Sequence, residues 1–341
     1  TRLLAHRGPD DEGYHVGGGI GLGHRRLAVV DASPQGHQPM GDSSRGLWLS
    51  YNGEFYNHRD YRPRLEAHGY RFRGQSDTET LLYLLDRGGP DALAEVAGIF
   101  GLALWDERRR RLVLARDPVG VKQLYYHDDG RRIVFASEIK ALLACPWVPR
   151  RIDLQAVNEY LHFHTPLFER TFFEGIEAVR PGEYLEITGR GVRPRVYWHL
   201  GGFDPRPGAP EEHVQALRAL LSQVVREQLM SDGPVGTFFS GGIDSSAVAS
   251  FAVRQGFPLQ GYGVHFKHPD VIDERPFQEA AARAIGLPLE LITVDAAGFP
   301  DDLMRLSYLQ DQPVIGAAMV PMYHVSRLAA RAVKVCLGGQ G

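Results

Sequence analysis

The sequence predicts two domains of different class, a layered and largely antiparallel sheet structure followed by an α/β domain with a parallel sheet. Its 341 residues favour two domains. Short strand-like runs separated by turns fill the first part, whereas strands alternate with helices in the second. The segment from Gly201 to Pro210 is rich in glycine and proline and lacks periodicity. We therefore place the boundary there, with domains at 1–205 and 206–341.

The first domain is predicted from short strands and a few helical stretches. Apolar and β-branched runs predict strands at residues 21–31, 47–51, 100–105, 112–116, 124–126, 133–136, 183–187 and 192–198. Helical spacing occurs at residues 61–68, 78–85, 138–144 and 154–163. Ser76 and Asp77 are expected to cap the second of these helices, so Asp77 has a structural interpretation.

The second domain is predicted from the alternation of helices and strands along the sequence. Helices are expected at residues 214–229, 247–253, 276–285 and 322–332, with strands at 235–239, 261–266, 289–294 and 334–337. Gly286 is the expected stop of the third helix. In a parallel α/β sheet, ligands bind at the carboxyl ends of the strands. Two glycine-rich segments lie at such ends, residues 240–246 and 338–341.

The stretch Ser240-Gly241-Gly242-Ile243-Asp244-Ser245-Ser246 has the pattern of a phosphate-binding loop. It lies between a predicted strand and the start of a helix. Glycines allow close approach of the backbone, and the first N–H groups of a helix attract phosphate. Because phosphate repels an acid unless a cation lies between them, we assign Asp244 to Mg²⁺ on pyrophosphate. A glycine turn capped by serines is the structural alternative.

Asn52-Gly53 also has two interpretations. On local signals alone this dipeptide favours a hairpin turn. The functional alternative is that the Asn52 amide and the Gly53 N–H, at a strand end, supply two donors to one oxyanion.

Composition excludes several classes of function. The 38 Lys and Arg residues nearly balance the 41 Asp and Glu residues, giving −3, so no basic field points to nucleic acid or an anionic membrane. No apolar run approaches the roughly 20 residues of a membrane span, and no signal-peptide pattern is visible. We expect a cytoplasmic protein. Cys145 and Cys336 are far apart and indicate neither a disulfide framework nor a metal site.

Motifs in both parts of the chain resemble one family. The 240–246 loop lacks the lysine of the ordinary P-loop and resembles the pyrophosphatase loop of ligases that split ATP to AMP and pyrophosphate. The whole chain resembles the glutamine-dependent asparagine synthetases. The motifs, in the order of the family, are Arg7-Gly8-Pro9-Asp10, Arg26-Leu27-Ala28-Val29-Val30-Asp31, residues 52–57, Ser76-Asp77-Thr78-Glu79, Arg116-Asp117-Pro118-Val119-Gly120, Ala136-Ser137-Glu138, Pro181-Gly182 and residues 240–246.

The resemblance implies an α+β N-terminal-nucleophile layered sandwich, with antiparallel sheets between helices, as a class II glutaminase. An ATP-pyrophosphatase synthetase domain with a parallel sheet follows it. In the first domain, Arg26 would pair with the α-carboxylate of glutamine and Asp77 with its α-ammonium. Asn52 and Gly53 would be catalytic as the oxyanion hole. The other implied glutamine-binding residues are Leu27, Ala28, Val29, Val30 and Glu54.

In the second domain the resemblance implies an ATP site. Phe238 and Val264 match the positions that hold adenine, and Asp244 would bind the metal. The remaining implied ATP-binding residues are Ser240, Gly241, Gly242, Ser245, Ser246, Gly338 and Gly339. Gln340 occupies a catalytic position where the family usually has a glutamate, and a glutamine can hydrogen-bond but cannot take a proton.

Two further departures concern the ends of the sequence. The glutaminase nucleophile of the family is a cysteine that becomes the first residue after methionine removal. Thr1 stands too close to Arg7-Gly8-Pro9-Asp10 to replace it. We therefore expect a sequence truncated at both ends, without its N-terminal start and without the C-terminal part of the synthetase domain.

The function implied is synthesis of asparagine from aspartate with glutamine as nitrogen donor. The β-carboxylate would be activated as aspartyl-AMP, releasing pyrophosphate, and ammonia would pass internally between the domains. ATP and Mg²⁺ are the implied cofactors; glutamine, aspartate and ATP are the implied substrates, and a homodimer is compatible with the family. One alternative is a related amidotransferase or lactam-forming enzyme of secondary metabolism. Another is a non-catalytic paralogue that only binds nucleotide or a partner.

Overall fold

The computed structural model describes residues 1–202, 205, 207–266, 273–313 and 318–339. It contains two compact units. The first comprises Thr1–Gly201 and the described residues 310–313, so the chain returns to it once after entering the second unit. Among the described residues, no helix is both long and apolar enough to cross a membrane.

The first unit is built on a six-stranded antiparallel sheet. The strand order is β11-β10-β6-β5-β4-β3. Side chains alternate between its faces: Leu102 and Leu104 pack into one core, whereas Ala103 and Trp105 pack into the core on the other side. The strands are β3 (Met40–Asp42), β4 (Leu47–Phe55), β5 (Gly98–Asp106), β6 (Arg111–Arg116), β10 (Glu183–Thr188) and β11 (Gly191–Val196).

Helices cover one face of this sheet. Helix α2 (Asp77–Gly88) is apolar over most of its length, and Leu81, Leu82 and Leu85 are buried against the sheet. Helix α1 (His58–Ala67) packs beside α2 and contributes Leu65 to the same core. A 3₁₀ helix, η3 (Pro90–Glu95), follows α2 and leads into β5.

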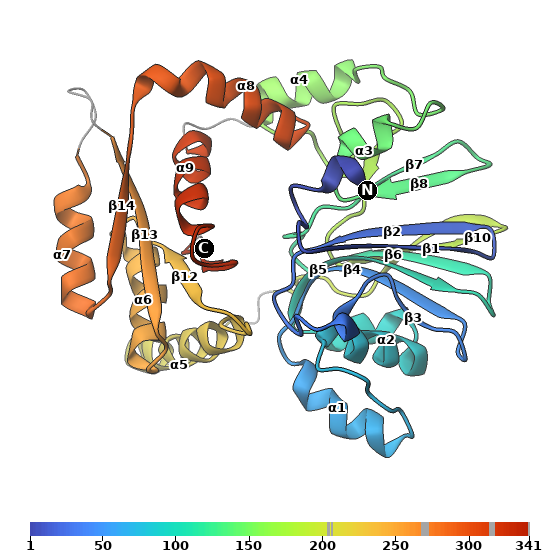
Figure 1. Cartoon of the computed structure of the whole chain (residues 1–341), viewed down its shortest axis with the longest axis horizontal. Helices are drawn as coiled ribbons and strands as arrows, with labels where there is room; N and C mark the ends of the chain where they lie inside the picture. Colours follow the sequence, from blue (N-terminus) through green and yellow to red (C-terminus); the bar gives the residue numbers. More distant parts are fainter. Residues whose placement is uncertain (203–204, 206, 267–272, 314–317, 340–341) are drawn as a thin grey trace. The chain divides into compact units, whose positions relative to one another are not determined.

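Two smaller antiparallel sheets cover the opposite face. One pairs β1 (Asp11–Gly17) with β2 (Ile20–Arg26), and the other has the order β8 (Ile133–Ala136), β7 (Tyr125–Asp128), β9 (Glu177–Ala178). Leu22 and Leu124 join the core on that face. Outside them, α3 (Ile139–Leu143) packs on Tyr125. The unit therefore has helix, sheet, sheet and helix layers (Figure 1). This confirms the predicted class, antiparallel sheets between helices.

Short elements complete the first unit. Helix α4 (Leu154–Phe163) is capped by Asp153, whose carboxylate accepts from the backbone N–H groups of Gln155 and Ala156. Two 3₁₀ turns, η1 (Arg2–Leu4) and η2 (Pro34–Gly36), lie in the N-terminal part.

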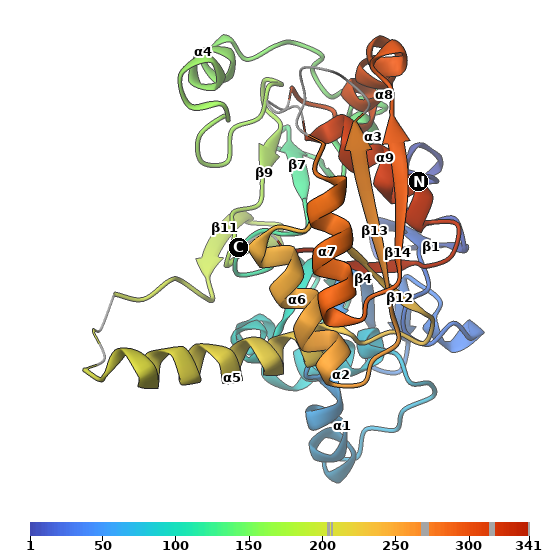
Figure 2. The same ribbon diagram turned by 90° about the vertical axis from the view of Figure 1, so that its left-hand side faces the viewer.

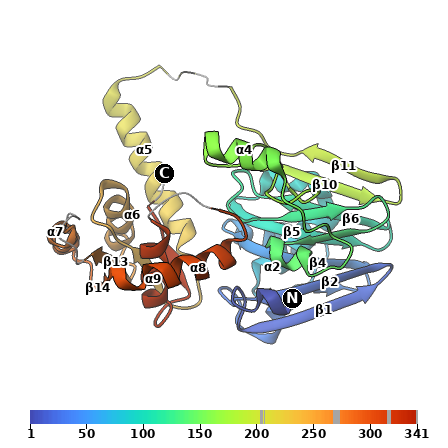
Figure 3. The ribbon, with the colours of Figure 1, turned by 90° about the horizontal axis from the view of Figure 1, so that it is seen from above.

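The second unit is a parallel α/β structure. Its strand order is β14 (Leu289–Val294), β13 (Leu259–Phe266), β12 (Val235–Phe238), β15 (Val335–Leu337), and every pairing is parallel. Helices α5 (Pro210–Gln228), α6 (Ile243–Arg254) and α7 (Arg275–Ile285) share the apolar core on one face, whereas α9 (Met319–Ala329) packs on the other. Figures 2 and 3 show α6 and α7 on the side of the sheet opposite α9. A 3₁₀ turn, η4 (Ala296–Gly298), precedes α8 (Phe299–Gln310).

Most predicted elements are present, and two local expectations are wrong. The strand expected at residues 21–31 ends at Arg26, because the chain turns there to wrap around the Arg26 side chain. The Asn52-Gly53 turn favoured by local signals does not form. Strand β4 continues to Phe55, with Asn52 opposite Gly101 and Gly53 opposite Phe100 in β5.

Candidate functional site

In the first unit, the predicted site residues gather where β4 ends and α2 begins. Asp77 is the first residue of α2 and is buried. Its Oδ2 accepts from the backbone N–H of Phe55 at 2.9 Å, and its Oδ1 accepts from Thr78 at 2.8 Å. The cap itself is Ser76, whose hydroxyl also accepts from Thr78. Asp77 therefore joins α2 to the strand that carries Glu54, a connection that a simple helix cap does not make.

Glu54 and Asp77 form a pair of acids. Burial, and then the charge of Asp77, raise the pKa of Glu54 to about 8, while the Lys122 ammonium lowers it. Burial raises the pKa of Asp77 to about 6, against the hydrogen bonds from Phe55 and Thr78. Two neighbouring carboxyl groups in a buried environment repel each other when both are ionised, so ionising the second one costs free energy. The pair is therefore suited to a cationic ligand, such as an ammonium group.

Gly53 is required by the sheet. A Cβ at this position would lie 2.1 Å from the carbonyl oxygen of Ile99 in β5. Only glycine allows β4 and β5 to pair here, and this brings the Asn52-Gly53 peptide into the interior of the sheet instead of a turn. The structure thus places Asn52 and Gly53 directly before Glu54 on one rigid strand.

Arg26 organises the loop that follows β2. Its buried guanidinium donates from Nη2 to the carbonyls of Val30 at 3.1 Å and Asp31 at 2.5 Å, and from Nη1 to Ser33 at 3.4 Å. Residues 27–30 are thereby held around it. The carboxylate of Asp31 accepts from the backbone N–H of Gln75 at 2.7 Å, two residues before Asp77. The loop and the start of α2 are therefore fastened together.

Lys122 belongs to this site and was not found from the sequence. Burial lowers its pKa, and it faces Glu54, Arg7 and Asp117. The fully buried Asp117 positions it, because its carboxylate accepts from the backbone N–H groups of Phe100, Val119, Val121 and Lys122. A lysine five residues after Asp117 matches no sequence pattern that would predict a site residue, because only the turn around Asp117 brings Lys122 to Glu54.

In the second unit, the loop predicted to bind phosphate connects β12 to α6. Gly241 has φ 77°, and a Cβ there would lie 2.9 Å from the Cα of Gln278 in α7. A side chain on Gly339 would lie 2.5 Å from the backbone nitrogen of Ser245, the third residue of α6. Glycine at these two positions therefore lets the backbone pack closely against α7 and against the N-terminus of α6, and a helix N-terminus is a position that favours anions.

The polar side chains of this loop are partly engaged with one another. The hydroxyls of Ser240 and Ser245 lie 3.0 Å apart, and Ser240 accepts from the N–H of Gly242 at 3.3 Å. The Ser246 hydroxyl is buried and has no hydrogen-bond partner among the described residues. A buried unpartnered donor beside the glycine loop fits a phosphate oxygen that is supplied by a ligand.

Asp244 is exposed in the first turn of α6. Within the described part of the chain, no group of three or more His, Cys, Asp or Glu side chains could hold a metal ion. Mg²⁺ carried on a polyphosphate is bound through one or two carboxylates of the protein, and Asp244 is one exposed carboxylate beside the loop.

The two positions matched to adenine lie together. Phe238, the last residue of β12, and Val264 of β13 pack on the same apolar cluster with Tyr262 and Val325. Gly338 and Gly339 follow β15, the neighbouring strand. The predicted ATP-binding residues are therefore collected at the carboxyl ends of adjacent parallel strands. Gln340 lies outside the described residues.

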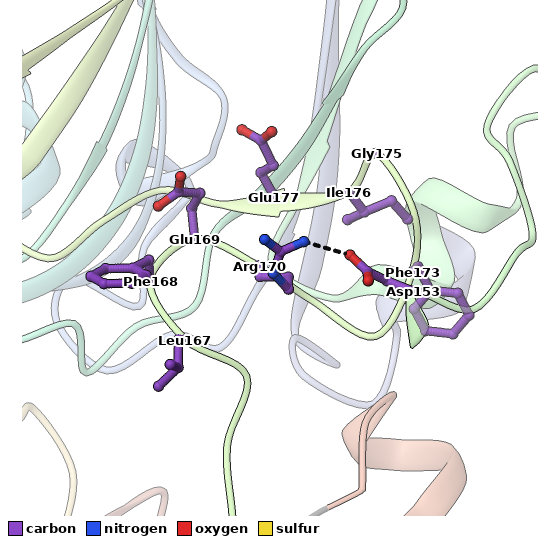
Figure 4. Close-up of a pocket in the computed structure, with 9 residues that line it drawn as sticks. All are labelled: Asp153, Leu167, Phe168, Glu169, Arg170, Phe173, Gly175, Ile176 and Glu177. Atoms are coloured by element: carbon purple, nitrogen blue, oxygen red, sulfur yellow. Dashed lines mark hydrogen bonds and ion pairs between the residues drawn. The ribbon is translucent and has the colours of Figure 1, made fainter. Parts of the chain in front are cut away.

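A separate cavity of about 150 Å³ lies in the first unit (Figure 4). It is lined by Asp153, Leu167, Phe168, Glu169, Arg170, Phe173, Gly175, Ile176 and Glu177, none of which the sequence predicted as a site residue. Arg170 Nη1 donates to Asp153 at 2.9 Å, and its Nε lies 3.3 Å from Glu159. Because its arginine is already paired, this cavity is a weak candidate for a binding site.

Comparisons with known proteins give matches to both units. Residues 1–198 match the family model of the glutamine amidotransferase domain, and residues 216–341 match the model described as asparagine synthase. Asparagine synthetase [glutamine-hydrolyzing] 1 of Bacillus subtilis is 32% identical over 341 residues, which cover 100% of this chain and 54% of the relative. Amidase chry2 of Gibberella zeae is 31% identical over 364 residues, covering 99% and 53%.

A third relative is covered more completely. The putative asparagine synthetase [glutamine-hydrolyzing] 2 of Methanocaldococcus jannaschii is 30% identical over 370 residues, which cover 100% of this chain and 70% of the relative. The chain spans about half the length of the first two relatives. Since the matches extend over both units, the chain belongs to the family of glutamine-hydrolysing asparagine synthetases.

Proposed function

We propose that the full-length protein is an ATP-dependent amidotransferase that makes asparagine from aspartate, with glutamine as the nitrogen donor. The observation that carries the proposal is that two acids, Glu54 and the buried Asp77, are held together where β4 meets α2 by the hydrogen bond from the Phe55 N–H to Asp77 Oδ2, and that each raises the cost of ionising the other. The positive charge of the glutamine α-ammonium would offset this cost. A glutaminase domain at 1–205 and a synthetase domain at 206–341, a cytoplasmic location and a homodimer are parts of the same proposal.

The first unit would hydrolyse glutamine. Asp77 and Glu54 would hold the α-ammonium, and Arg26 the α-carboxylate, in the loop that contains Leu27, Ala28, Val29 and Val30. Asn52 and Gly53 would donate hydrogen bonds to the oxyanion that forms when the side-chain amide is attacked. Rigid placement of Asn52 and Gly53 on β4 supports this role, since oxyanion donors act best when they are preorganised.

The second unit would activate the acceptor. The β-carboxylate of aspartate would attack the α-phosphorus of ATP, forming aspartyl-AMP and releasing pyrophosphate. Ammonia would then attack the carbonyl carbon, and AMP would leave. The glycines at 241, 242, 338 and 339 and the serines at 240, 245 and 246 would bind the phosphates, with adenine against Phe238 and Val264. Mg²⁺ held by Asp244 would neutralise the negative charge of the pyrophosphate.

One observation favours a different acceptor. The chain is as similar to a relative named an amidase as to some named asparagine synthetases. In that case the same two units would amidate another carboxylate or close a lactam. Gln340 adds to this alternative, because a glutamine cannot serve as a base.

The deciding experiment measures aspartate-dependent pyrophosphate release and amide formation by the full-length protein, beside its Gln340→Glu variant. Asparagine formation by both proteins supports the proposal. If neither protein turns over aspartate while both still hydrolyse glutamine, the acceptor is a different carboxylate. Sequencing the native N-terminus by peptide analysis tests the glutaminase half, which requires a first residue of cysteine.

A further inference from the structure

A chain of buried charges connects the segment after α8 to the N-terminal segment of the first unit. Lys140 Nζ lies 2.9 Å from Asp311 Oδ1 and 2.6 Å from Glu138 Oε2. Glu138 Oε1 lies 3.1 Å from Arg7 Nη1 and 3.0 Å from His6 Nε2. The side chains of Glu138, Lys140 and Asp311 are 7, 9 and 8% exposed. Ion pairs this deeply buried are strongly destabilised when one partner is removed.

The charges of this chain alternate and cancel. Arg7 is positive, Glu138 negative, Lys140 positive and Asp311 negative, and each neighbour in the series is within ion-pair distance. The hydrogen bonds to Lys140 and Arg7 hold the pKa of Glu138 below its usual range, although burial alone would raise it. Removing the charge of Glu138, Lys140 or Asp311, the three members that are buried, therefore unbalances the interior by one charge.

Further hydrogen bonds hold the segment after α8 against the first unit. Asp311 Oδ2 accepts from the backbone N–H of Ile139, the first residue of α3, at 2.7 Å. The side chain of Gln312 accepts from the backbone N–H of Phe172 at 3.1 Å and lies 3.4 Å from the Tyr125 hydroxyl. These contacts explain why residues 310–313 belong to the first unit although α8 up to Leu309 belongs to the second.

Each end of the charge chain leads to a candidate site. At one end, Gly8 follows Arg7, and a Cβ on Gly8 would lie 2.5 Å from the backbone nitrogen of Arg26. The Asp10 carboxylate accepts from the N–H of Ala28 at 2.8 Å. At the other end, Leu306 of α8 packs in the apolar cluster that also contacts Val264. Within the first unit, Arg7 is therefore followed directly by backbone that packs on Arg26, and Asp311 follows a helix that packs, within the second unit, in the cluster of Val264.

We propose that Lys140 and Asp311 are positioning residues for the glutamine site, and that they make glutamine hydrolysis depend on the segment that follows α8. The inference rests on the proposed glutaminase function. Lys140 pairs with Glu138, and Asp311 pairs with Lys140. They act by holding Glu138, and through it Arg7 and the backbone that packs on Arg26. Since coupling through a packed network needs direct evidence, the test compares variants at both ends.

The experiment uses the full-length protein with Asp311→Asn and Lys140→Met. We expect kcat/KM for glutamine to fall about 10-fold, within the usual range of coupling between sites, while ammonia-dependent synthesis stays near the wild-type rate. Amides of residues 5–8 should exchange with solvent faster in both variants. Asp311→Glu, which keeps the charge, should restore part of the loss. The control is Glu174→Gln, which breaks the exposed Arg151–Glu174 ion pair of the same unit and should change nothing.

The outcomes separate this inference from the proposed function. The inference would be overturned if both variants kept the glutamine kinetics and the hydrogen-exchange rates of the wild-type protein. It would also be overturned if glutamine-dependent and ammonia-dependent synthesis fell in parallel, because that result would indicate a general structural role. If the wild-type protein uses neither glutamine nor ammonia, the proposed function is overturned, and hydrogen exchange at residues 5–8 alone then tests the inference.

If the single variants do not fold, the charge-balanced double variant Lys140→Met/Asp311→Leu replaces them, with the same expected fall in kcat/KM for glutamine. A double-mutant cycle combines Arg7→Met with Asp311→Asn. The kcat/KM of the double variant for glutamine should fall no further than that of the more impaired single variant.

Discussion

The backbones of Gly339 and Ser245 are in direct contact. A Cβ on Gly339 would overlap the Ser245 nitrogen at 2.5 Å and the carbonyl carbon of Asp244 at 2.6 Å. The segment after β15 thus rests on the first turn of α6, where phosphate is expected to bind. Any side chain at position 339 must push these two backbone segments apart.

Gly339→Ala should therefore weaken nucleotide binding. Overpacking of this kind costs about 1–3 kcal/mol, so we expect KM for ATP to rise about 10-fold, measured by pyrophosphate release. Gly233→Ala, at an exposed position of the same unit, is the control, because the nearest described atom to its Cβ position is Ser231 Oγ at 4.0 Å. Equal effects of the two substitutions would contradict the proposed contact.

Asp244→Asn should abolish Mg²⁺-dependent pyrophosphate release and leave glutamine hydrolysis in place. Asp244 is exposed, so the loss should come from the metal and not from unfolding. The control is Asp301→Asn, an exposed acid in the first turn of α8. Both substitutions remove a favourable interaction with a helix dipole, worth about 0.3–1 kcal/mol. An Asp244→Asn variant that melts early but releases pyrophosphate normally would exclude the metal role.

Asn52→Ala should lower kcat for glutamine hydrolysis about 100-fold with little change in KM, as expected for the loss of one oxyanion donor. Asn57→Ala is the comparison. Asn57 accepts from the N–H of Ala97 at 2.9 Å and donates to the carbonyl of Glu95 at 3.3 Å, so its loss should lower thermal stability without changing kcat. Steady-state glutaminase assays with thermal denaturation distinguish the two, and identical behaviour would remove Asn52 from the oxyanion hole.

The Glu54–Asp77 pair predicts a pH dependence of stability. Both folded pKa values lie above the ordinary carboxyl values, so the folded state binds these protons more tightly than the unfolded state. The stabilisation is complete below about pH 4 and is lost as pH rises through about 6 and 8. Glu54 alone should contribute a loss of about 2 kcal/mol in the free energy of unfolding between pH 6 and pH 8.

Thermal denaturation from pH 5 to pH 9, with and without glutamine, tests this dependence. Glutamine should protect more strongly as pH rises, because its ammonium offsets the second carboxylate. Glu54→Gln should flatten the pH profile, whereas Glu66→Gln, at an exposed position of α1, should not. Unchanged profiles for Glu54→Gln would mean that the two acids do not interact in the free protein.

Local signals were sufficient for many elements. The bounds of α4, β8 and β14 agree with the predicted ranges, and Gly286 ends α7 in the left-handed conformation. These segments have strong periodicity or clear stop residues. The strand, glycine loop and helix of residues 235–254 were also predicted, because they are consecutive in the sequence; the phosphate-binding role of the loop stays a prediction.

Features that depend on distant partners were not predictable. Asn52-Gly53 has the local preference of a turn, and only pairing with β5 keeps it extended. Lys122 and Glu54 are brought together by Asp117, and Ile139 and Asp311 are 172 residues apart in sequence. Strand β1 and helix α8 were missed. In β1 only Gly13 is buried, so the strand has no alternating apolar pattern that a sequence would reveal.

The charge balance from Arg7 to Asp311 also restricts how this family can vary. A lysine at position 140 with a neutral residue at 311, or the reverse, changes the net charge of this cluster by one, so each single change costs stability or activity that a paired change avoids. Evolutionary drift at these two positions should therefore favour paired replacement. Across homologues, we expect positions 140 and 311 to be charged together or uncharged together, a pattern of covariation that sequence comparison can detect without any enzyme assay.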